Sequence, residues 1–367
     1  MNISIITTVN HNIGDDFVRD GIIFLLKKHF KGKELNFELI HKHSPITSRH
    51  GFEWFRNYDY SSRVDRLLPL WITKDRILEA DFVVQSGAPV YWCNDTVGWH
   101  CAVNEWYTPL IERRFSKNRK GKLLNLAAGA CQPYHSDGSE FLQCSQDREY
   151  VERFYKTAAV TTVRDRLAKS ILEKLGYSVP VIPCSSIFAA DKHGLQSSGE
   201  EYVVVNYMKG GGHFDFGQKI DEQKWEREFT AFYNIIKEKE NVIFACHNRQ
   251  ELDNALRIDG DARTFISTDY LEYMKFYSRG KFGIMNRVHG AFLMASFGKP
   301  SLVIGSDTRA KMVAEIGLES IFVNDADCDL LTRKYFELQS RSLSYPEEFK
   351  VIKEQALEEY LRALQDI

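Results

Sequence analysis

The stretch KFGIMNRVHGAFLMASFGKPSLVIG, residues 281–305, decides the fold. Residues 281–285 and 301–305 are short apolar runs of the kind that form buried strands. Between them, residues 290–297 follow a helical pattern, and Gly298-Lys299-Pro300 forms a turn. A strand, a helix and a second strand in this order predict a parallel sheet of the α/β class.

The same alternation runs through the rest of the chain, on both sides of a polar stretch at residues 191–201. Glycines and serines make that stretch the best candidate for a linker. We therefore expect one α/β domain over residues 1–190, a second over 199–345, and a C-terminal helix over 346–367 that packs back on the body. A length of 367 residues also exceeds what one hydrophobic core usually supports.

Apolar runs and helical patterns give the expected elements. The predicted strands cover residues 3–9, 37–41, 80–85, 122–126, 158–163, 202–206, 241–246, 281–285 and 301–305. The predicted helices cover residues 15–29, 165–175, 222–239, 269–278 and 290–297, besides the C-terminal helix. Residues 42–79 and 88–120 have no regular pattern.

Composition excludes several classes of function. The chain carries 48 basic and 50 acidic side chains, so its formal charge of -2 gives no global attraction for nucleic acid or an acidic membrane. The seven cysteines are scattered without a Cys-x-x-Cys pair, which indicates no zinc site and favours a reducing, cytoplasmic compartment. The chain shows no signal peptide and no run of eighteen apolar residues. Peripheral association with a membrane and the oligomeric state stay open.

The most informative segment for function joins the strand at 281–285 to the helix after it. In an extended segment Arg287 and His289 point to the same side and can converge on one ligand. The start of a helix near Gly290 favours a phosphate or carboxylate, and glycine lets the backbone approach closely. The alternative is that Arg287 pairs with a structural carboxylate while His289 caps the helix. Its place at a strand-to-helix junction favours a functional site.

Two further junctions in the first half carry candidate residues. Arg164 should project from the end of a strand, where it can meet an anion, whereas Asp165 is better placed to cap the next helix. Asn12 and Asp15 follow the first strand, and Asp15 could be a general base. Asp15 or Asp16 could equally only complement the dipole of the first helix.

Three weaker signals remain. The loop around Gly211, within Gly210–Gly212, could cradle a phosphate, but it lacks the Lys-Ser/Thr ending of a P-loop, so a flexible surface loop is favoured over a lid. His247 could face the same cleft as His289, although a surface histidine at a strand end is the simpler interpretation. His41 and His43 share a face without a third ligand nearby, so we predict no metal site.

Aromatic residues are concentrated between Trp54 and Tyr107. Such side chains can stack on a sugar, although core packing accounts for most of them. The candidates are Tyr91, Trp92, Trp99, Trp106 and Tyr107.

Taken in order, these pieces resemble the polysaccharide pyruvyl transferase family. The motifs are Asn12-Ile13-Gly14-Asp15, Val163-Arg164-Asp165, and Arg287-x-His289-Gly290 continuing through Gly298-Lys299-Pro300 to Gly305. The resemblance implies two Rossmann-like domains facing a cleft, as in GT-B glycosyltransferases. It also implies an acceptor side in the N-terminal domain and a donor side in the C-terminal domain.

The resemblance further implies the chemistry. The donor would be phosphoenolpyruvate, and pyruvate would be attached as a ketal across two hydroxyls of a sugar, with release of phosphate and no metal or organic cofactor. By motif, Arg164, Arg287 and His289, with Gly290, would bind the donor. His289 is then the first candidate for proton transfer, and Asp15 the second. The acceptor would be a sugar or a lipid-linked oligosaccharide of surface polysaccharide synthesis.

Two alternatives remain open. A GT-B glycosyltransferase that uses a nucleotide sugar shares the architecture and the basic donor pocket, although the second half shows no distinctive nucleotide signature. A non-catalytic glycan-binding protein is the other, and the presence of Arg164, Arg287 and His289 together argues against it.

Overall fold

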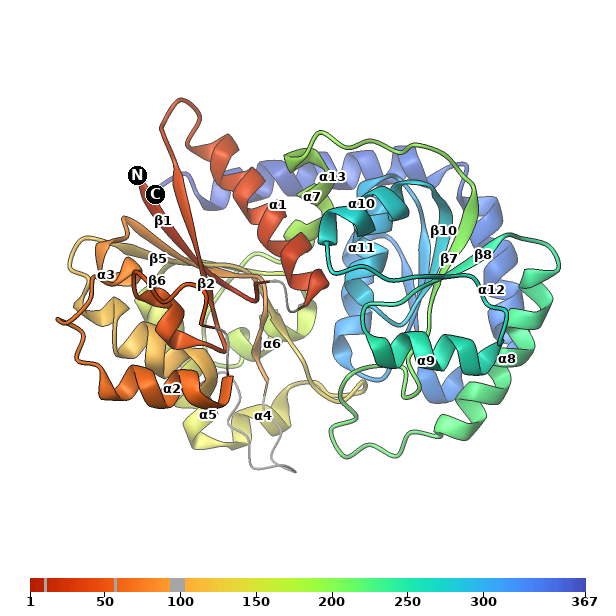
Figure 1. The fold of residues 1–367 in the computed structure, drawn as a ribbon, viewed down its shortest axis with the longest axis horizontal. Helices are drawn as coiled ribbons and strands as arrows, with labels where there is room; N and C mark the ends of the chain where they lie inside the picture. The colour runs from red at the N-terminus through yellow and green to blue at the C-terminus, as the bar shows by residue number, and fades with distance from the viewer. Residues whose placement is uncertain (10–11, 56–57, 93–102) are drawn as a thin grey trace. The chain divides into compact units, whose positions relative to one another are not determined.

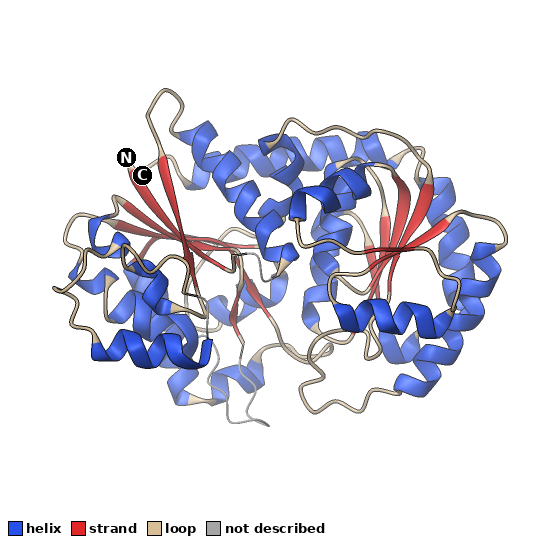
Figure 2. Ribbon diagram, viewed as in Figure 1, coloured by secondary structure: helices blue, strands red, loops and turns tan. Residues whose placement is uncertain are grey.

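The computed structural model describes residues 1–9, 12–55, 58–92 and 103–367. The chain forms two compact units, each built on its own sheet (Figure 1). Unit 1 comprises Met1–Cys131, Asp137–Ile182 and Glu359–Ile367, and unit 2 comprises Gln132–Ser136 and Pro183–Glu358. Figure 2 shows helices on both sides of each sheet, which is the layered arrangement of doubly wound α/β folds.

The sheet of unit 1 has the order β2-β1-β3-β5-β4, with β6 paired to β5. All of these pairings are parallel. Its strands are β1 (Asn2–Thr7), β2 (Asn36–His41), β3 (Phe82–Ser86), β4 (Pro89–Tyr91), β5 (Lys122–Ala130) and β6 (Ala158–Val163). Its helices are α1 (Ile13–His29), η1 (Pro45–Ser48), α2 (Tyr58–Leu67), α3 (Arg76–Glu79), η3 (Val103–Glu112), η4 (Phe115–Lys117), α4 (Ser139–Gln143), α5 (Ser145–Thr157) and α6 (Arg166–Glu173).

The sheet of unit 2 has the order β12-β11-β10-β7-β8-β9, again parallel throughout. Its strands are β7 (Tyr202–Asn206), β8 (Val242–Ala245), β9 (Thr264–Phe265), β10 (Gly280–Met285), β11 (Ser301–Gly305) and β12 (Glu319–Phe322). Its helices are η5 (Ser185–Phe188), α7 (Ala189–Lys192), α8 (Glu222–Lys237), α9 (Arg249–Ile258), α10 (Tyr270–Ser278), α11 (Val288–Ser296), η6 (Thr308–Ile316), η7 (Val323–Asp325) and α12 (Cys328–Arg341). Helix α13 (Tyr345–Ala363) begins in unit 2, and its last residues belong to unit 1.

Local sequence explains why these segments take these forms. Strands β3 and β7 are buried at every position, as expected for parallel strands covered on both faces. Helices α1 and α6 begin at side-chain caps: Asn12 accepts from the Gly14 N–H, and Asp165 accepts from the Ala168 N–H at 2.7 Å. The capping role predicted for Asp165 is confirmed.

The predicted fold class, two parallel α/β domains, is confirmed, but the chain divides at other points. It enters unit 2 at Pro183, before the glycine- and serine-rich stretch at 191–201. The reason is packing, because η5 and α7 bury Ile187 and Phe188 and lie against α11 of unit 2. Residues 359–367 then return to unit 1.

The sequence pattern missed several short strands as well as the longer helices α5, α9 and α12. Strands β4, β9 and β12 have three, two and four residues, too few to show a period. The region predicted as irregular at 42–79 contains α2 and α3. Within the described residues, no helix combines the length and apolar character needed to cross a bilayer.

Candidate functional site

The carboxyl ends of the central strands of unit 2 meet at one edge of the sheet. Met285, the last residue of β10, lies in register with Asn206 of β7 and Val303 of β11. The residues that follow these strands therefore lie beside one another. Ligands of open α/β sheets bind at this edge.

Two asparagines fix the backbone at this edge. Asn206 accepts from the Arg287 N–H at 2.9 Å and donates to the Ala245 carbonyl at 2.9 Å. Asn286 donates to the Ile304 carbonyl at 2.7 Å. Together these hydrogen bonds link the ends of β7, β8, β10 and β11. They therefore fix the position of the backbone at Arg287. Sequence reasoning assigned neither asparagine a role, and the only signal was an amide side chain at the end of an apolar run.

Arg287 is held by a buried carboxylate. Its Nε donates to Glu251 Oε1 at 2.8 Å, and its Nη2 contacts the same oxygen. The two side chains are only 12% and 4% exposed. Burial raises the pKa of Glu251, but attraction to Arg287 and His247 and the hydrogen bonds from both outweigh it, so this pKa lies below its ordinary value. The expected alternative, in which Arg287 pairs with a carboxylate of the protein, is therefore confirmed for this side chain. Arg287 Nη1 makes no hydrogen bond to any described residue.

His289 lies in the first turn of α11 and not in an extended segment. The helix begins at Val288, and Arg287 is its N-cap with extended φ and ψ of -87° and 102°. The extended segment from which the alignment was predicted ends at Arg287, so the convergence of Arg287 and His289 on one ligand stays a prediction. Both side chains are half-buried at the start of α11. A Cβ at the buried Gly290 would lie 3.0 Å from the Tyr277 hydroxyl, so glycine here allows close packing of α11 on α10.

His247 belongs to the same network as Glu251 and Arg287. Its backbone N–H donates to Glu251 Oε2 at 2.9 Å, and its Nε2 lies 3.2 Å from the Tyr277 hydroxyl. Burial, together with the nearby Arg287 charge, lowers the pKa of His247 to about 3. The imidazole is therefore neutral near neutral pH. The simpler interpretation of a surface histidine is wrong.

The triple-glycine loop is packed, not free. Gly211 is buried, its N–H donates to the Met208 carbonyl at 2.9 Å, and its φ of +69° suits glycine. A Cβ there would lie 2.7 Å from Val323 Cγ2. Gly211 is therefore packed within a loop whose other residues are partly or fully exposed, and its role with a phosphate stays a prediction.

At the corresponding edge of unit 1, Asn12 and Asp15 lie at the start of α1. Asn12 caps the helix, and the buried Asp15 accepts from Thr8 Oγ1 at 2.8 Å, with Lys42 Nζ 3.9 Å away. The next residue, Asp16, is 1% exposed and pairs with Arg19. Burial raises the pKa of Asp16 to about 6, against the opposing effect of Arg19.

A histidine and a carboxylate, His43 and Glu105, also pair at this edge. His43 Nδ1 lies 2.6 Å from Glu105 Oε1 of η3. Burial raises the pKa of Glu105, but His43 and Lys42 together lower it below its ordinary value. Sequence reasoning missed Glu105 and Lys42 because their partners are far along the chain. The described residues contain no group of three or more histidines, cysteines or carboxylates arranged for a metal ion.

Arg164 takes a different course from the one predicted. Its side chain is fully buried, and its Nη1 donates to the Gly87 carbonyl at the end of β3. It also lies against the backbone at Gly129, and its own N–H donates to the Ala128 carbonyl at 2.9 Å. Arg164 therefore turns back over the strand ends of its own unit instead of projecting beyond them. Its role with a donor stays a prediction.

The aromatic candidates are mostly core residues. Tyr91, Trp106 and Tyr107 are buried in the hydrophobic core of unit 1, and Trp92 packs against it. Trp99 lies outside the described residues. Core packing explains the described members of this set.

A family model for polysaccharide pyruvyl transferase matches residues 12–308, which is most of the chain. The chain belongs to the polysaccharide pyruvyl transferase family. The match includes the strand-to-helix junctions at Asp15, Arg164 and Arg287. This is a family of transferases. Comparison with curated protein sequences finds no match.

Solved structures with the same architecture are enzymes of nucleotide sugars. The UDP-GlcNAc 2-epimerase of Methanocaldococcus jannaschii, solved with UDP-GlcNAc and UDP, has a TM-score of 0.54 at 12% identity, covering 92% of each chain. S. aureus MnaA, solved with UDP, also gives 0.54 at 12% identity, covering 95% of this chain and 90% of its own. At this identity the likeness shows the fold alone, which is the GT-B-like pair of Rossmann-like domains.

Proposed function

We propose that this protein transfers pyruvate from phosphoenolpyruvate to a sugar of a surface polysaccharide, or to its lipid-linked precursor, as a ketal. The observation that carries the proposal is the position of Arg287. Within the family match, its guanidinium is fixed along one edge by Glu251 at the start of α11, and Nη1 is left for a ligand. The reaction takes place in the cytoplasm and needs no metal or organic cofactor.

The donor binds at unit 2. Phosphoenolpyruvate carries a phosphate and a carboxylate, so it needs more than one fixed positive group. Arg287 and the N-terminal end of α11 supply two of them, because the positive end of the helix dipole favours anions. His289 lies in the first turn of the same helix, and Arg164 is the candidate for a further contact.

The proposed reaction needs three proton movements. The methylene carbon of the donor gains a proton, which leaves an oxocarbenium-like centre at the carbon bearing the phosphate. One sugar hydroxyl attacks this carbon and loses its proton, and the second hydroxyl then loses its proton and forms the other C–O bond as phosphate leaves with the C–O bonding pair. His289 is the candidate acid for the first step. Asp15, held between Thr8 and Lys42, is the candidate base for a hydroxyl.

The test is phosphate release from phosphoenolpyruvate with a panel of glycans and lipid-linked precursors, with binding of the donor measured separately by thermal shift. The double substitution Arg287→Gln with Glu251→Gln removes the charge without leaving a buried carboxylate unpaired. It should weaken donor binding by about 10- to 100-fold, the value of a charge-assisted hydrogen bond. His289→Gln should slow phosphate release by about 100-fold or more with a smaller effect on binding.

Arg249→Gln is the matched control, because this exposed arginine pairs with Asp253 on α9, close in sequence to Glu251. It should leave both measurements unchanged. Phosphate release that persists in the Arg287 and His289 variants would reject the site. Thermal protection by a UDP-sugar but not by phosphoenolpyruvate would favour a nucleotide-sugar glycosyltransferase instead.

A further inference from the structure

One region of unit 1 exposes an unusual amount of apolar surface. The described residues include eleven exposed large hydrophobic side chains, and five of them fall between residues 54 and 72. These are Trp54, Tyr60, Leu67, Trp71 and Ile72. Trp71 is 85% exposed and Leu67 is 81% exposed, so neither supports the core. Apolar exposure concentrated in one stretch of the chain favours an interaction site there.

Helix α2 gives part of this region a defined face. Tyr60, Arg63 and Leu67 recur at helical spacing and are exposed on one stripe, with Arg66 beside them. Ser61 and Asp65 lie on the opposite stripe and are buried. The outward face of α2, a helix at the lower left of Figure 1, thus carries apolar and basic side chains together.

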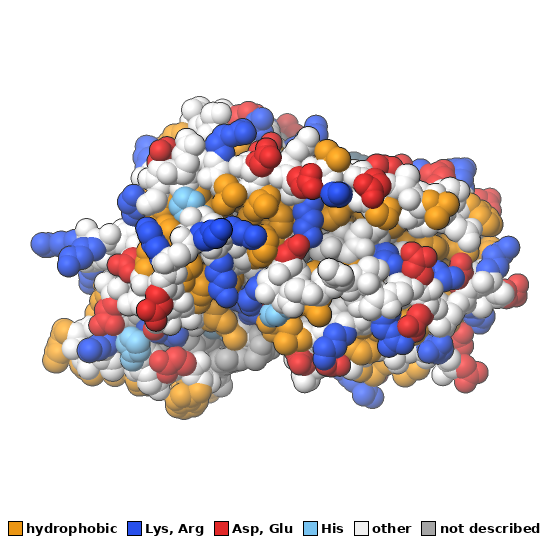
Figure 3. All heavy atoms as spheres, turned by 90° about the horizontal axis from the view of Figure 1, so that it is seen from above, with side chains coloured by type: hydrophobic (Ala, Val, Ile, Leu, Met, Phe, Trp, Pro, Cys, Tyr) orange, Lys and Arg blue, Asp and Glu red, His pale blue; other side chains and the backbone are white. Residues whose placement is uncertain are grey.

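The exposed charges on this surface are mainly basic. Arg63, Arg66 and Lys74 are exposed, and none of the three forms an ion pair with another described residue. The nearby carboxylates of Glu53 and Glu79 each lie within 4 Å of His50, at 3.9 and 3.4 Å. Figure 3 shows a different pattern on the face it displays, where acidic and basic side chains are interspersed.

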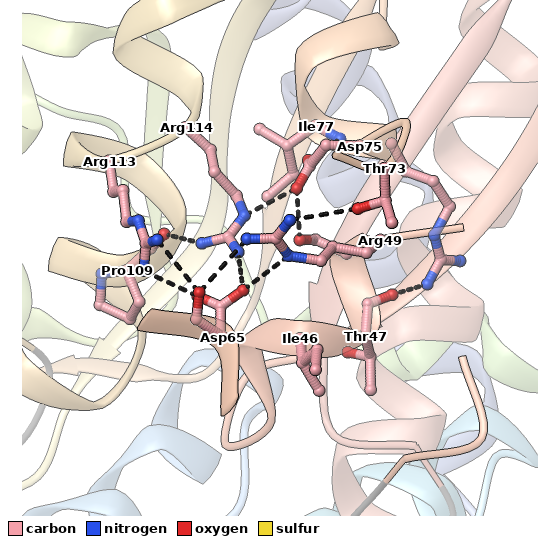
Figure 4. A network of polar contacts seen from close by, with 12 residues as sticks. Ile46, Thr47, Arg49, Asp65, Thr73, Asp75, Ile77, Pro109, Arg113 and Arg114 are labelled. Atoms are coloured by element: carbon pink, nitrogen blue, oxygen red, sulfur yellow. Dashed lines mark hydrogen bonds and ion pairs between the residues drawn. The ribbon is translucent and has the colours of Figure 1, made fainter. Parts of the chain in front are cut away.

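The turn that carries Trp71 and Ile72 is fastened from beneath. The fully buried Arg49 donates through Nη1 to Thr73 Oγ1 at 3.1 Å (Figure 4). It also donates through Nη1 to the Pro69 carbonyl at 3.0 Å and through Nη2 to the Leu68 carbonyl. These bonds hold the backbone at Leu68 and Pro69, before Trp71, and the side chain of Thr73 after it. The backbone that carries the exposed Trp71 indole is therefore held in place by buried hydrogen bonds.

The same network anchors α2. Asp65 accepts from Arg49 Nε at 2.9 Å and Arg113 Nη1 at 3.1 Å, and it also pairs with Arg114 (Figure 4). Arg114 reaches onward to Asp75 at 2.8 Å. A buried network of this kind is rigid, because each charge is fixed by several partners. A rigid surface loses little conformational entropy when it binds.

We propose that this surface, made of Tyr60, Arg63, Arg66, Leu67, Trp71, Ile72 and Lys74, docks the protein on a membrane that contains anionic lipids. Its aromatic and aliphatic side chains enter the interface, where tryptophan and tyrosine are favoured, and its three basic side chains contact lipid head groups. The docking does not depend on the transfer reaction proposed above. It would also bring the enzyme to lipid-linked acceptors.

The test is co-sedimentation of the full chain with vesicles of phosphatidylcholine alone and of phosphatidylcholine mixed with phosphatidylglycerol. The protein should bind the mixed vesicles, and added salt should weaken that binding. The triple substitution R63Q/R66Q/K74Q should weaken it on the order of 100-fold, since each basic side chain near such a surface contributes about fivefold. The double substitution L67A/W71A should weaken it by about tenfold or more.

Leu343→Ala is the matched control, because Leu343 is 88% exposed in unit 2 and should not affect binding. Brominated lipids should quench wild-type fluorescence more than that of Trp71→Phe. Equal binding to both kinds of vesicle, no binding, or unchanged binding of L67A/W71A at an unchanged melting temperature would overturn the proposal. A dimer that L67A/W71A dissociates, without vesicle binding, would assign the surface to a second copy of the chain and overturn it too.

Discussion

The carboxyl edges of the two sheets differ in the charged groups that they hold. In unit 2, Arg287 and Glu251 form a closed ion pair, and His247 beside them is held neutral. In unit 1, the start of α1 holds Asp15 and Asp16 in neighbouring positions, and the pKa of Asp16 is raised to about 6. One edge therefore presents a fixed guanidinium and the start of a helix, whereas the other holds a carboxyl group that titrates near neutral pH.

This difference separates two chemical tasks. A preorganised cation and a helix N-terminus suit an anionic substrate, because they need no rearrangement when it binds. A carboxyl group beside a second, titrating carboxyl group, as Asp15 lies beside Asp16, suits proton exchange with neutral hydroxyls. The comparison thus supports a donor side in unit 2 and an acceptor side in unit 1, and it can be broken by experiments on each edge.

The largest expected effect concerns the ion pair of unit 2. Arg287→Ala leaves Glu251, which is 4% exposed, as a buried charge without its main partner. Breaking such a pair should cost about 3–5 kcal/mol in the free energy of unfolding. Adding Glu251→Gln to Arg287→Ala should recover most of that loss. Urea denaturation of the four proteins of this cycle measures the coupling.

The exposed Arg249→Ala is the control for this cycle and should change stability little, because its pair with Asp253 is solvated. Equal stability of Arg287→Ala and the wild type would contradict a closed pair. The edge of unit 2 would then differ from that of unit 1 in its residue types, but it would not contain a closed, buried ion pair.

The second effect concerns Asp16 of unit 1. Its pKa is about 6 in the folded chain against an ordinary value of 3.8, so the folded chain binds this proton more tightly than the unfolded one. The free energy of unfolding therefore falls as pH rises from about 4 to about 6. Asp16→Asn should be more stable than the wild type by up to about 3 kcal/mol above pH 6, and the difference should vanish near pH 4. Thermal or urea unfolding across this range measures it.

Asp137→Asn provides a control of opposite sign. Hydrogen bonds from the Ser139 backbone and side chain, and from Lys174, lower the pKa of the exposed Asp137 to about 2. Removing this carboxylate should lower stability near neutral pH instead of raising it. If Asp16→Asn also lowers stability there, its pairing with Arg19 outweighs burial, and the contrast between the two edges fails on the side of unit 1.

The sequence predicts the strands and the junctions well because both are local. The runs at 158–163, 202–206 and 301–305 match β6, β7 and β11 at every residue, since apolar runs with polar flanks mark buried parallel strands. The same logic placed Arg287 at the edge of a sheet. The backbone at His289 was mispredicted as extended, because the helix starts two residues earlier than the pattern suggested.

The partners could not be predicted, because they lie far along the chain. Glu251 is 36 positions from Arg287, and Asn206 is 81 positions away. No periodicity links residues across different strands, and side-chain direction depends on neighbours that only the folded chain supplies. Arg164 shows the same limit: its position at a strand end was predicted, but its contact with Gly87, 77 positions away, was not.

Near neutral pH the smallest effect concerns His247 of unit 2, and it has the opposite pH dependence from Asp16. Its pKa is about 3 in the folded chain against an ordinary value of 6.5, so the unfolded chain binds this proton more tightly. The free energy of unfolding therefore falls as pH drops from about 6.5 toward 3, by about 2 kcal/mol at about pH 5. His247→Gln keeps a polar group near the Tyr277 hydroxyl but cannot titrate, so it should lose this part of the acid sensitivity. The readout is the slope of unfolding free energy against pH, with the imidazole titrated directly by NMR. An unchanged slope, or an imidazole that titrates near 6.5, would show that His247 is solvated and that the edge of unit 2 is less closed than that of unit 1.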